Sequence, residues 1–331
     1  MENLQKGLLM IVVLAVSAML IGCGPTQHQA LSPVEIFETS EGFIFEEAGE
    51  KIMSYQRRHK SINGKFMRAN YIHPLYGLDG QVLTEDFPAD HPHHRGIFWA
   101  WHQVWLGDKK LGDNWAAQNF FWDVYDAKIL TVDSKSRALQ VHVLWKSPLW
   151  TDADGEKKAF LKETTTIRVH RTQNDIRKID FEIQLLALEE GMRLGGSEDV
   201  KGYGGFTTRI PLPDGLSFTG TRGPVEPNNL SVEAGPWLDF SGDFGGDGNI
   251  SGLTILCHNS SPDYPQRWIL RRKGSAQNPV YPGRHPISLS RDKPLILRYR
   301  LIIHRGKLSR GELNQFQAEY NSELLPLFDN R

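Results

Sequence analysis

Ala138-Leu-Gln-Val-His-Val-Leu-Trp145 alternates between apolar and polar residues, and this period of two is typical of a half-buried β-strand. The same period recurs in residues 163–170 and 178–185, while residues 294–303 are rich in β-branched and aromatic side chains. Turn-forming pairs such as Asp154-Gly155 separate these runs. The sequence therefore predicts an all-β chain.

One amphipathic helix is predicted near the end of the chain, over residues 309–320. Ser309, followed three residues later by Glu312, has the spacing of a capping box, which marks a helix N-terminus. The apolar residues on one face of this segment are Leu313, Phe316 and Tyr320. Many strands without a domain-sized linker favour one large, twisted antiparallel β-sandwich with a short C-terminal helix over a string of small modules.

The amino terminus resembles the signal peptide of a bacterial lipoprotein. An apolar run ends in Leu20-Ile-Gly-Cys23, and this run is shorter than the roughly 20 residues that span a bilayer. We therefore expect residues 1–22 to be removed and Cys23 to carry lipid. Gly24 stands where an aspartate would favour retention at the inner membrane. The expected location is thus the bacterial outer membrane, with the lipid-anchored protein facing the periplasm or the exterior.

The remainder of the chain has the composition of an ordinary globular protein. Residues 23–33 are expected to form a tether and residues 34–331 a single β-sandwich domain. A formal net charge of −1, without a basic stripe, argues against a nucleic-acid partner. Cys257 is the one cysteine besides Cys23, and its apolar neighbours predict a buried core residue, so no disulfide is expected.

Four of the twelve histidines lie within His91-Pro-His-His-Arg-Gly-Ile-Phe-Trp-Ala-Trp-His-Gln103. Histidine titrates near neutral pH and binds metal ions, so this density indicates a functional site. In an extended segment His91 and His93 would share one face, and we predict them as metal ligands. The cofactor stays open, with a divalent metal as the candidate. The alternative is a proline-containing surface turn before a core strand.

Five of the nine tryptophans follow closely, between residues 99 and 122. Strand alternation would place Ile97, Trp99, Trp101 and Trp105 on the face opposite Phe98, Ala100, His102 and Val104. Indole rings beside polar groups suit the C–H faces of sugar rings, and the predicted sugar platforms are Trp99, Trp101 and Trp115. The alternative is that these rings belong to a tryptophan-rich core.

A glycine-rich segment, residues 195–209, carries a second group of polar side chains. We predict Glu198, or its neighbour Asp199, as a general base or a metal ligand, and Lys201 as a group that orients a charged substrate or stabilises an enolate. The same segment supplies two predicted substrate contacts, Tyr203 and Arg209. The alternative is a tight surface loop whose charges pair with one another.

Five segments resemble the bacterial proteins called PmoA-like, a family of uncharacterised function: Asp90–Gly96, Trp99–Gln103, Ser197–Phe206, Ala234–Gly242 and Tyr299–Gly306. The name suggests a methane monooxygenase subunit, which would need several apolar spans, so we reject that activity. The resemblance implies a function that involves carbohydrates and a fold similar to the galactose-mutarotase-like supersandwich. In mutarotase-like enzymes a histidine donates a proton and a carboxylate removes one, which implies such roles for His94 or His102 and for Glu198.

These patterns predict a lipid-anchored carbohydrate-active protein whose partners are a glycan or oligosaccharide and, through its lipid, a membrane. We expect an enzyme that acts by hydrolysis, elimination or epimerisation, with one cleft formed by two groups of residues. The catalytic group is His94, His102, Glu198 and Lys201, and the substrate-binding group is Arg95, Trp99, Trp101, Trp115, Tyr203 and Arg209. The rival hypothesis is a noncatalytic glycan-binding lipoprotein. A metal-dependent oxygenase would rest on the histidines alone.

Overall fold

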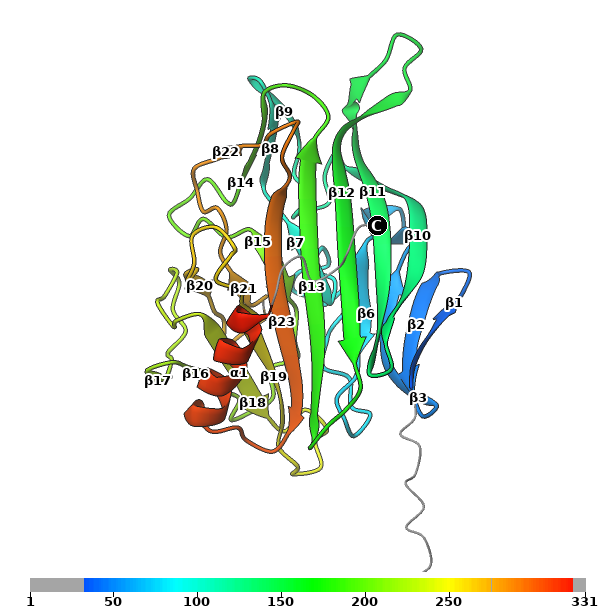
Figure 1. Ribbon diagram of the computed structural model, residues 1–331. Helices are drawn as coiled ribbons and strands as arrows, with labels where there is room; N and C mark the ends of the chain where they lie inside the picture. The colour runs from blue at the N-terminus through cyan, green and yellow to red at the C-terminus, as the bar shows by residue number, and fades with distance from the viewer. Residues whose placement is uncertain (1–32, 275, 324–331) are drawn as a thin grey trace, which may run out of the picture. The chain divides into compact units, whose positions relative to one another are not determined.

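Alternating segments of the sequence form three of the long strands of the structure, a computed structural model that describes residues 33–274 and 276–323. Within these residues the largest sheet has nine antiparallel strands, in the order β10-β11-β12-β13-β23-β19-β18-β16-β17. Figure 1 shows β11, β12, β13 and β23 side by side. The strands are β10 (Phe121–Asp133), β11 (Ser136–Thr151), β12 (Lys157–His170), β13 (Ile176–Ala187), β23 (Leu295–Arg305), β19 (Ser251–Cys257), β18 (Trp237–Gly242), β16 (Ser217–Gly220) and β17 (Gly223–Pro224).

Strand β11 shows the physical basis of this sheet. Leu139, Val141 and Val143 are fully buried, whereas the intervening Gln140 and His142 are partly exposed. All four strands predicted from the sequence are confirmed, as β11, β12, β13 and β23, and backbone pairing extends the first three beyond the predicted residues. The buried Cys257 ends β19, as its apolar neighbours predicted.

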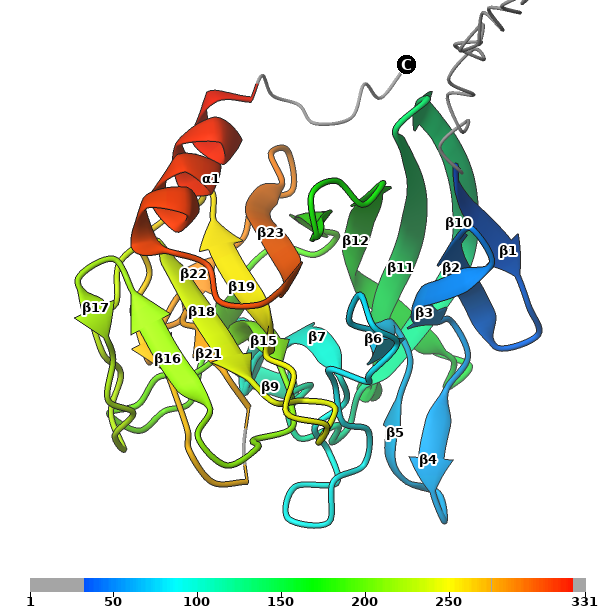
Figure 2. The same ribbon diagram turned by 90° about the horizontal axis from the view of Figure 1, so that it is seen from below.

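A second sheet has six strands in the order β1-β2-β3-β6-β7-β15 within the described residues. Its strands are β1 (Val34–Glu38), β2 (Gly42–Glu47), β3 (Glu50–Gln56), β6 (Tyr71–Leu75), β7 (Ile97–Ala100) and β15 (Gly205–Thr208). Figure 2 shows both sheets from below. The remaining strands form a four-stranded sheet of β22 (Ile287–Ser288), β14 (Met192–Gly195), β8 (Gln103–Leu106) and β9 (Lys109–Gly112), and two ribbons, β4 (Lys60–Ile62) with β5 (Lys65–Arg68) and β20 (Trp268–Ile269) with β21 (Asn278–Pro279).

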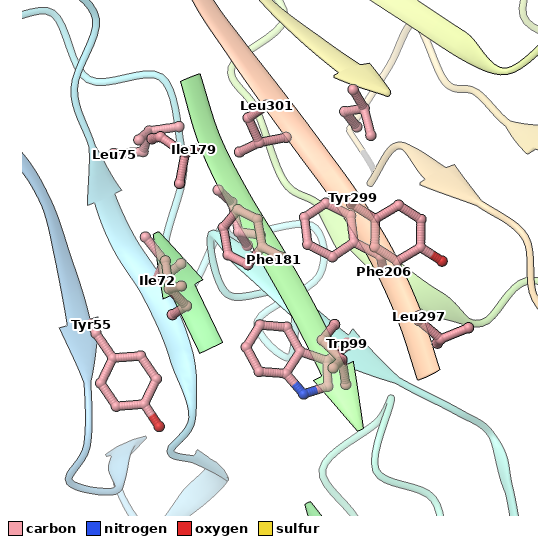
Figure 3. Close-up of a cluster of buried hydrophobic side chains, with 14 of the residues drawn as sticks. Tyr55, Ile72, Leu75, Trp99, Ile179, Phe181, Phe206, Leu297, Tyr299 and Leu301 are labelled. Atoms are coloured by element: carbon pink, nitrogen blue, oxygen red, sulfur yellow. The ribbon is translucent and has the colours of Figure 1, made fainter. Parts of the chain in front are cut away.

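Aromatic side chains of the two large sheets meet in the main core (Figure 3). Phe206 of β15 stacks on Tyr299 of β23 with ring centroids 4.5 Å apart. Trp99 of β7 packs edge-on against Phe181 of β13 at 6.5 Å. Since aromatic side chains bury the largest apolar areas, these contacts hold the two layers together. The predicted antiparallel, all-β sandwich is confirmed.

The chain turns a corner between β7 and β8, because these strands belong to different sheets. Ile97, Trp99 and Trp101 face the main core, as alternation predicted. The prediction is wrong beyond the corner, where Val104 also enters the main core and Trp105 is only half-buried. The change of sheet at residues 101–102 interrupts the period of two, and it leaves the His102 side chain beside the cavity described below.

The C-terminal helix α1 (Arg310–Ser322) is also confirmed. Ser309 is its N-cap and forms the predicted capping box with Glu312. Leu313 and Tyr320 pack on an outer apolar patch of the nine-stranded sheet, formed by Trp237, Leu256 and Ile302. Among the residues that the structure describes, no helix has the length and apolar character needed to cross a membrane. The predicted signal peptide and the predicted lipid-carrying Cys23 lie outside those residues.

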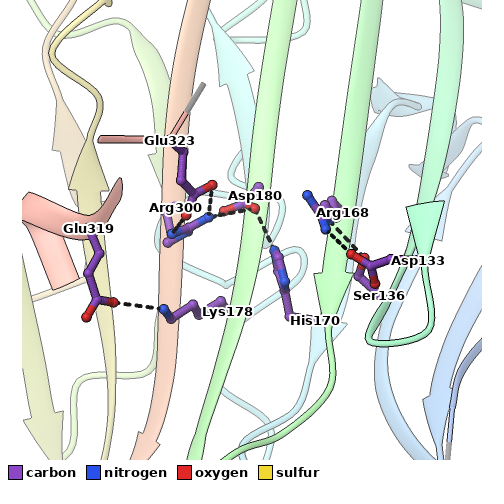
Figure 4. A network of polar contacts seen from close by, with 9 residues as sticks. All are labelled: Asp133, Ser136, Arg168, His170, Lys178, Asp180, Arg300, Glu319 and Glu323. Carbon is purple, nitrogen blue, oxygen red and sulfur yellow. Dashed lines mark hydrogen bonds and ion pairs between the residues drawn. The ribbon is translucent and has the colours of Figure 1, made fainter. Parts of the chain in front are cut away.

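A polar network joins the end of α1 to the outer face of the same sheet (Figure 4). The buried Arg300 donates to both carboxylate oxygens of Asp180 and also to Glu323, the C-cap of α1. His170 Nε2 lies 2.7 Å from Asp180 Oδ2. A buried ion pair with further hydrogen bonds fixes geometry, so this network holds α1 against β13 and β23.

Candidate functional site

All four histidines of residues 91–103 meet two residues of the glycine-rich segment, Lys201 and Tyr203, at one cavity of about 310 Å³, called here the histidine pocket. Its walls come from the turn before β7, the corner before β8, the turn after β9, the loop between β14 and β15, and the segment after β20. The lining residues are His91, His93, His94, His102, Trp115, Ala116, Lys201, Tyr203, Ile269, Arg271 and Ala276.

A tight turn brings three of the histidines together. The His94 backbone N–H donates to His91 O at 2.9 Å, which folds the segment back on itself. The His91 and His94 rings stack with centroids 4.8 Å apart, and the His93 ring meets His94 edge-on at 4.5 Å. The extended segment predicted here is therefore wrong. The proline-containing turn that was its alternative is present, and it lines the pocket.

Arg209 holds this turn in place from outside the pocket lining. Its buried guanidinium donates to Glu85 at 2.6 Å and to both carboxylate oxygens of Asp90, and Asp90 in turn lies 2.8 Å from His91 Nδ1. Burial would raise the pKa of Asp90, but hydrogen bonds from His91 and Arg209 lower it to about 2. Arg209 was predicted as a substrate contact, and the structure instead makes it a positioning residue for His91.

His102 is oriented by a carboxylate on the neighbouring turn. Its Nδ1 lies 2.8 Å from Asp113 Oδ2, and its Nε2 is buried without a hydrogen-bond partner in the described part of the chain. Because an ionised carboxylate only accepts, Nδ1 donates this hydrogen bond, and in the neutral ring Nε2 then has the lone pair. The His102 ring stacks on Trp115 at 5.4 Å and meets Tyr203 edge-on at 4.9 Å. This arrangement suits a general base.

Burial and nearby positive charges keep two of the other histidines, His93 and His94, neutral. Burial, together with the neighbouring His93 and His91, lowers the pKa of His94 to about 2. Burial and the Arg68 guanidinium lower the pKa of His93 to about 4. A proton donor must first hold the proton, so the predicted role of His94 as a catalytic acid is disfavoured at neutral pH. Its neutral ring forms the pocket wall between His91 and Trp115.

Arg68 lies behind the pocket with no acidic partner among the described residues. Its guanidinium sits 4.6 Å from the ring centroids of both Phe98 and Trp122, and it donates to the Asn114 and Trp115 carbonyls. Burial lowers the pKa of Arg68 to about 9. The guanidinium thus places positive charge close to the histidines and fixes the turn that carries Trp115.

The glycine-rich loop folds by close backbone contact. A Cβ on Gly196 would meet Gly202 O at 2.1 Å, so a side chain there has no room. Asp199 accepts from Ser197 Oγ and from the Lys201 backbone N–H, and it lies 3.4 Å from Lys201 Nζ. These bonds show that Asp199 stabilises the loop. They agree with the alternative prediction for this segment, a tight surface loop whose charges pair with one another. They also place Lys201 and Tyr203 at the pocket.

Glu198 does not line the pocket. Its side chain is exposed and pairs with Lys110 at 3.3 Å, on the outer surface of the loop. The predicted contact between Glu198 and the histidines is therefore absent from the described structure. Side chains at successive loop positions diverge, so the backbone that aims Lys201 and Tyr203 inward leaves Glu198 outside.

Two of the three predicted tryptophan platforms belong to the core. Trp99 donates its Nε1 proton to Glu163 at 2.7 Å, and Trp101 donates to the Tyr281 carbonyl at 2.9 Å. Both rings are almost completely buried, which is the alternative that the sequence left open. Trp115 alone of the three lines the pocket.

Arg95 is likewise structural. Its fully buried guanidinium pairs with Asp86, donates to the carbonyls of Lys60 and Phe66, and lies over the rings of Tyr71 and Phe87. With its donors taken by the protein, Arg95 cannot serve as the predicted substrate contact. Instead it ties the β4–β5 ribbon to the histidine turn.

The sequence alone did not identify Asp113 or Arg68. Asp113 lies in an ordinary Gly-Asp-Asn turn, and nothing local distinguishes it from other turn aspartates. Arg68 looks like a surface arginine at the end of a short strand. The partners of both residues come from other elements, so a local pattern could not identify them.

The predicted metal ligands His91 and His93 both reach the pocket. Within the described residues, however, no three His, Cys, Asp or Glu side chains are placed to share one metal ion. Zinc sites use at least three protein ligands, so the proposed pair finds no third ligand in this part of the chain. The rings pack on one another instead.

Comparison with known proteins gives a family and no curated relative. No curated protein matches the chain. Residues 45–318 match the sequence profile of DUF6807, described as a family of unknown function. The matched range includes the histidine turn, the glycine-rich loop and most of α1. The chain therefore belongs to the DUF6807 family.

Proposed function

We propose that this protein is a carbohydrate-active enzyme whose histidine pocket removes a proton from a sugar carbon next to a carbonyl or carboxylate. That step begins both elimination and epimerisation. The observation that carries the proposal is the His102 side chain, which lines the pocket with Asp113 on Nδ1 and an unpaired Nε2. A carboxylate that fixes the tautomer and ring orientation is the usual support of a histidine base.

Elimination and epimerisation are favoured over hydrolysis by the chemistry of the lining. Glycoside hydrolysis commonly uses two carboxylic acids that flank the scissile bond. The described lining of the pocket contains neither Asp nor Glu. It contains Lys201 and Arg271, whose positive charges stabilise the negative charge that develops when a C–H bond is broken.

The reaction balances with the residues present. His102 Nε2 takes the proton, and the C–H electron pair moves into an enolate beside Lys201 and Arg271. In elimination the enolate forms a C=C bond and expels the oxygen of the neighbouring glycosidic bond. Tyr203 donates its phenolic proton to that oxygen and recovers a proton from the His102 imidazolium. In epimerisation the Tyr203 hydroxyl donates its proton to the same carbon on the opposite face, and it then recovers a proton from the His102 imidazolium.

Tyr203 is suited to the donor role. Burial raises the pKa of its phenol, so the hydroxyl remains protonated at neutral pH. Its ring packs edge-on against His102 and lies 5.0 Å from Trp115. Trp115 is only 4% exposed, so it offers a sugar ring the small part of its aromatic surface that lines the pocket.

The location and ancestry of the enzyme are part of the same proposal. The sequence Leu20-Ile-Gly-Cys23 supports a lipid anchor at Cys23 and attachment to the outer membrane. The resemblance to PmoA-like proteins and to the mutarotase-like supersandwich supports a carbohydrate substrate. We assign no methane oxidation to the chain.

The test compares turnover with solvent exchange. The protein is incubated in D₂O with uronate-containing and neutral oligosaccharides, and products are followed by mass spectrometry for deuterium on carbon and for an unsaturated fragment. We expect His102→Ala to lower turnover by roughly 10²- to 10⁴-fold, the usual contribution of a general base. Asp113→Asn should cost at least roughly 10- to 100-fold, because it weakens the hydrogen bond that fixes the tautomer and orientation of His102.

The alternative function predicts a different result. A noncatalytic glycan-binding lipoprotein would bind sugars through Trp115 and produce neither exchange nor a new product. Binding without any turnover by the wild-type protein, or full turnover by His102→Ala, would refute the proposed reaction. Exposed Glu198→Gln is the matched control, since its side chain pairs with Lys110 outside the pocket lining and should leave turnover unchanged.

A further inference from the structure

The histidine pocket lies at the end of a row of three cavities. Ala116 lines both the pocket and a second cavity of about 510 Å³, and Phe121 lines both the second cavity and a third of about 600 Å³. One continuous stretch of chain lines all three cavities. Trp115 and Ala116 line the histidine pocket, residues 116–121 line the second cavity, and residues 121–124 line the third. The three cavities therefore adjoin along one strip of surface.

Side chains from the opposite wall link neighbouring cavities in the same order. The Phe66 ring of the second cavity lies 6.4 Å from His93 of the pocket. His59 of the third cavity stacks on Phe121, with ring centroids 4.3 Å apart. Phe66 belongs to β5 and His59 precedes β4, so the β4–β5 ribbon borders the row. We call this row the basic groove, for the charges described next.

Positive side chains dominate the lining of the groove. Six lysine or arginine residues line the three cavities: Arg57, Arg58, Lys65, Lys157, Lys201 and Arg271. Only two carboxylates do so, Glu38 and Asp123, and each is already paired, with Arg57 and Lys146 respectively. The whole chain has 38 basic and 39 acidic residues, so the groove is locally enriched in positive charge.

Several of these charges are free to meet a ligand. Arg58, Lys65 and Lys157 are exposed and make no ion pair with any residue in the described ranges. Lys157 Nζ lies 5.5 Å from the centre of the Phe121 ring, so a cation and an aromatic surface stand side by side midway along the groove. Exposed charges without partners cost little to keep in water, and they attract an oppositely charged ligand.

We propose that the basic groove binds an anionic oligosaccharide, a chain of several sugars bearing carboxylate or sulfate groups, with its reacting sugar in the histidine pocket. This inference deepens the proposed function and rests on it. The pocket alone has the volume of a small ligand site, at the lower end of the roughly 300–1,000 Å³ range, whereas the adjoining cavities extend well beyond one sugar. Elimination needs a leaving group, and an extended ligand supplies one in the glycosidic oxygen between two sugars. Expelling this oxygen cleaves the chain.

A single-stranded nucleic acid is the other ligand that cations and aromatic rings attract. The structure favours the glycan, because the groove ends at a carboxylate-oriented histidine that suits proton abstraction from carbon. The test must therefore distinguish binding of a nucleic acid from binding of an anionic glycan.

The experiment measures binding by calorimetry with full-length protein carrying His102→Ala, so that ligands stay intact. The probes are galacturonate monomer, dimer, tetramer and hexamer, neutral maltose oligomers of equal length, a sulfated hexasaccharide and an oligothymidylate. We expect affinity to rise with the length of the anionic series and to fall with added salt. Lys65→Ala with Lys157→Ala should weaken hexamer binding roughly 3- to 30-fold, as expected for two exposed ion pairs, and leave the monomer unchanged.

A matched double variant, Lys51→Ala with Lys307→Ala, removes two exposed lysines outside the groove lining and should change nothing. Stronger binding of the sulfated hexasaccharide than of the galacturonate hexamer would support the proposal with sulfate as the anion. Equal affinity for all lengths, equal affinity for neutral chains, or preference for oligothymidylate would overturn it. Turnover is measured separately with the wild-type protein. Binding that depends on chain length, without turnover, would refute the proposed reaction but not the groove. Turnover of the dimer, with binding that does not depend on chain length, would refute the groove but not the reaction.

Discussion

Trp99 Nε1 on β7 donates a hydrogen bond of 2.7 Å to Glu163 Oε1 on β12, and so joins the two large sheets through the middle of the sandwich. The fully buried carboxylate accepts three more hydrogen bonds, from Asn70, Trp145 and Thr165. Burial raises the pKa of Glu163, and these four donors oppose that effect. Trp99 was predicted to bind substrate, and its side chain instead belongs to the core between the two large sheets.

Removing this carboxylate should destabilise the protein strongly. Glu163→Ala leaves four buried donors without their acceptor, and we expect a loss on the order of 3–5 kcal/mol in the free energy of unfolding. Urea denaturation at pH 7 measures it. Glu156→Ala, at an exposed turn position, is the control and should change stability by less than about 0.5 kcal/mol. A loss below about 1 kcal/mol for Glu163→Ala would show that the donors find other partners.

Acid should destabilise the fold through His94. Its folded pKa of about 2 lies below the value of 6.5 for an unperturbed histidine, so the unfolded chain binds the extra proton as pH falls. The stability contributed by the neutral ring is complete above about pH 6.5 and is lost progressively toward pH 2. Between pH 7 and pH 5 the loss should be about 2 kcal/mol for this one residue.

His94→Gln tests this pH dependence, because an amide does not titrate. We expect the variant to lose less stability than the wild type between pH 7 and pH 5, measured by urea denaturation at each pH. His285→Gln makes the same change at an exposed position and should follow the wild-type curve. Parallel curves for His94→Gln and the wild type would mean that the folded protein admits the proton at His94.

The two ion pairs that hold α1 should differ in strength. Arg300→Leu leaves the buried Asp180 with His170 as its remaining partner and should cost on the order of 3–5 kcal/mol. Lys178→Ala breaks the solvent-exposed pair with Glu319 and should cost no more than about 1 kcal/mol. Urea denaturation compares the two, and equal costs would contradict the burial argument.

Lipid attachment is predicted at Cys23. Cells expressing the full chain and fed labelled palmitate should yield labelled protein in the membrane fraction. Cys23→Ala should abolish both the label and the membrane association. Cys257→Ala should retain both, because that thiol is buried and burial raises its pKa. Label that persists in Cys23→Ala would disprove the anchor.

The local sequence was sufficient to predict four strands of the large sheet and the helix. Alternation predicted β11, β12 and β13, a richness in β-forming side chains predicted β23, and the capping box predicted α1, because strand and helix patterns are set by neighbours a few residues apart. It also identified the two segments that supply the pocket, since histidine, lysine and tyrosine beside glycine are rarely needed for packing alone. Trp115, His102, Lys201 and Tyr203 were predicted by name and line the cavity.

Only the tertiary structure decided which side chains of those segments line the histidine pocket. Asp113 reaches His102 because β8 and β9 pair as a hairpin, and Arg209 reaches Asp90 across 119 positions of sequence. Trp99, Trp101 and Arg95 carry the right chemistry for binding, yet core packing and buried acceptors take them. A residue type fixes what a side chain can do, whereas strand register and the turns between sheets fix which partners stand within hydrogen-bond distance.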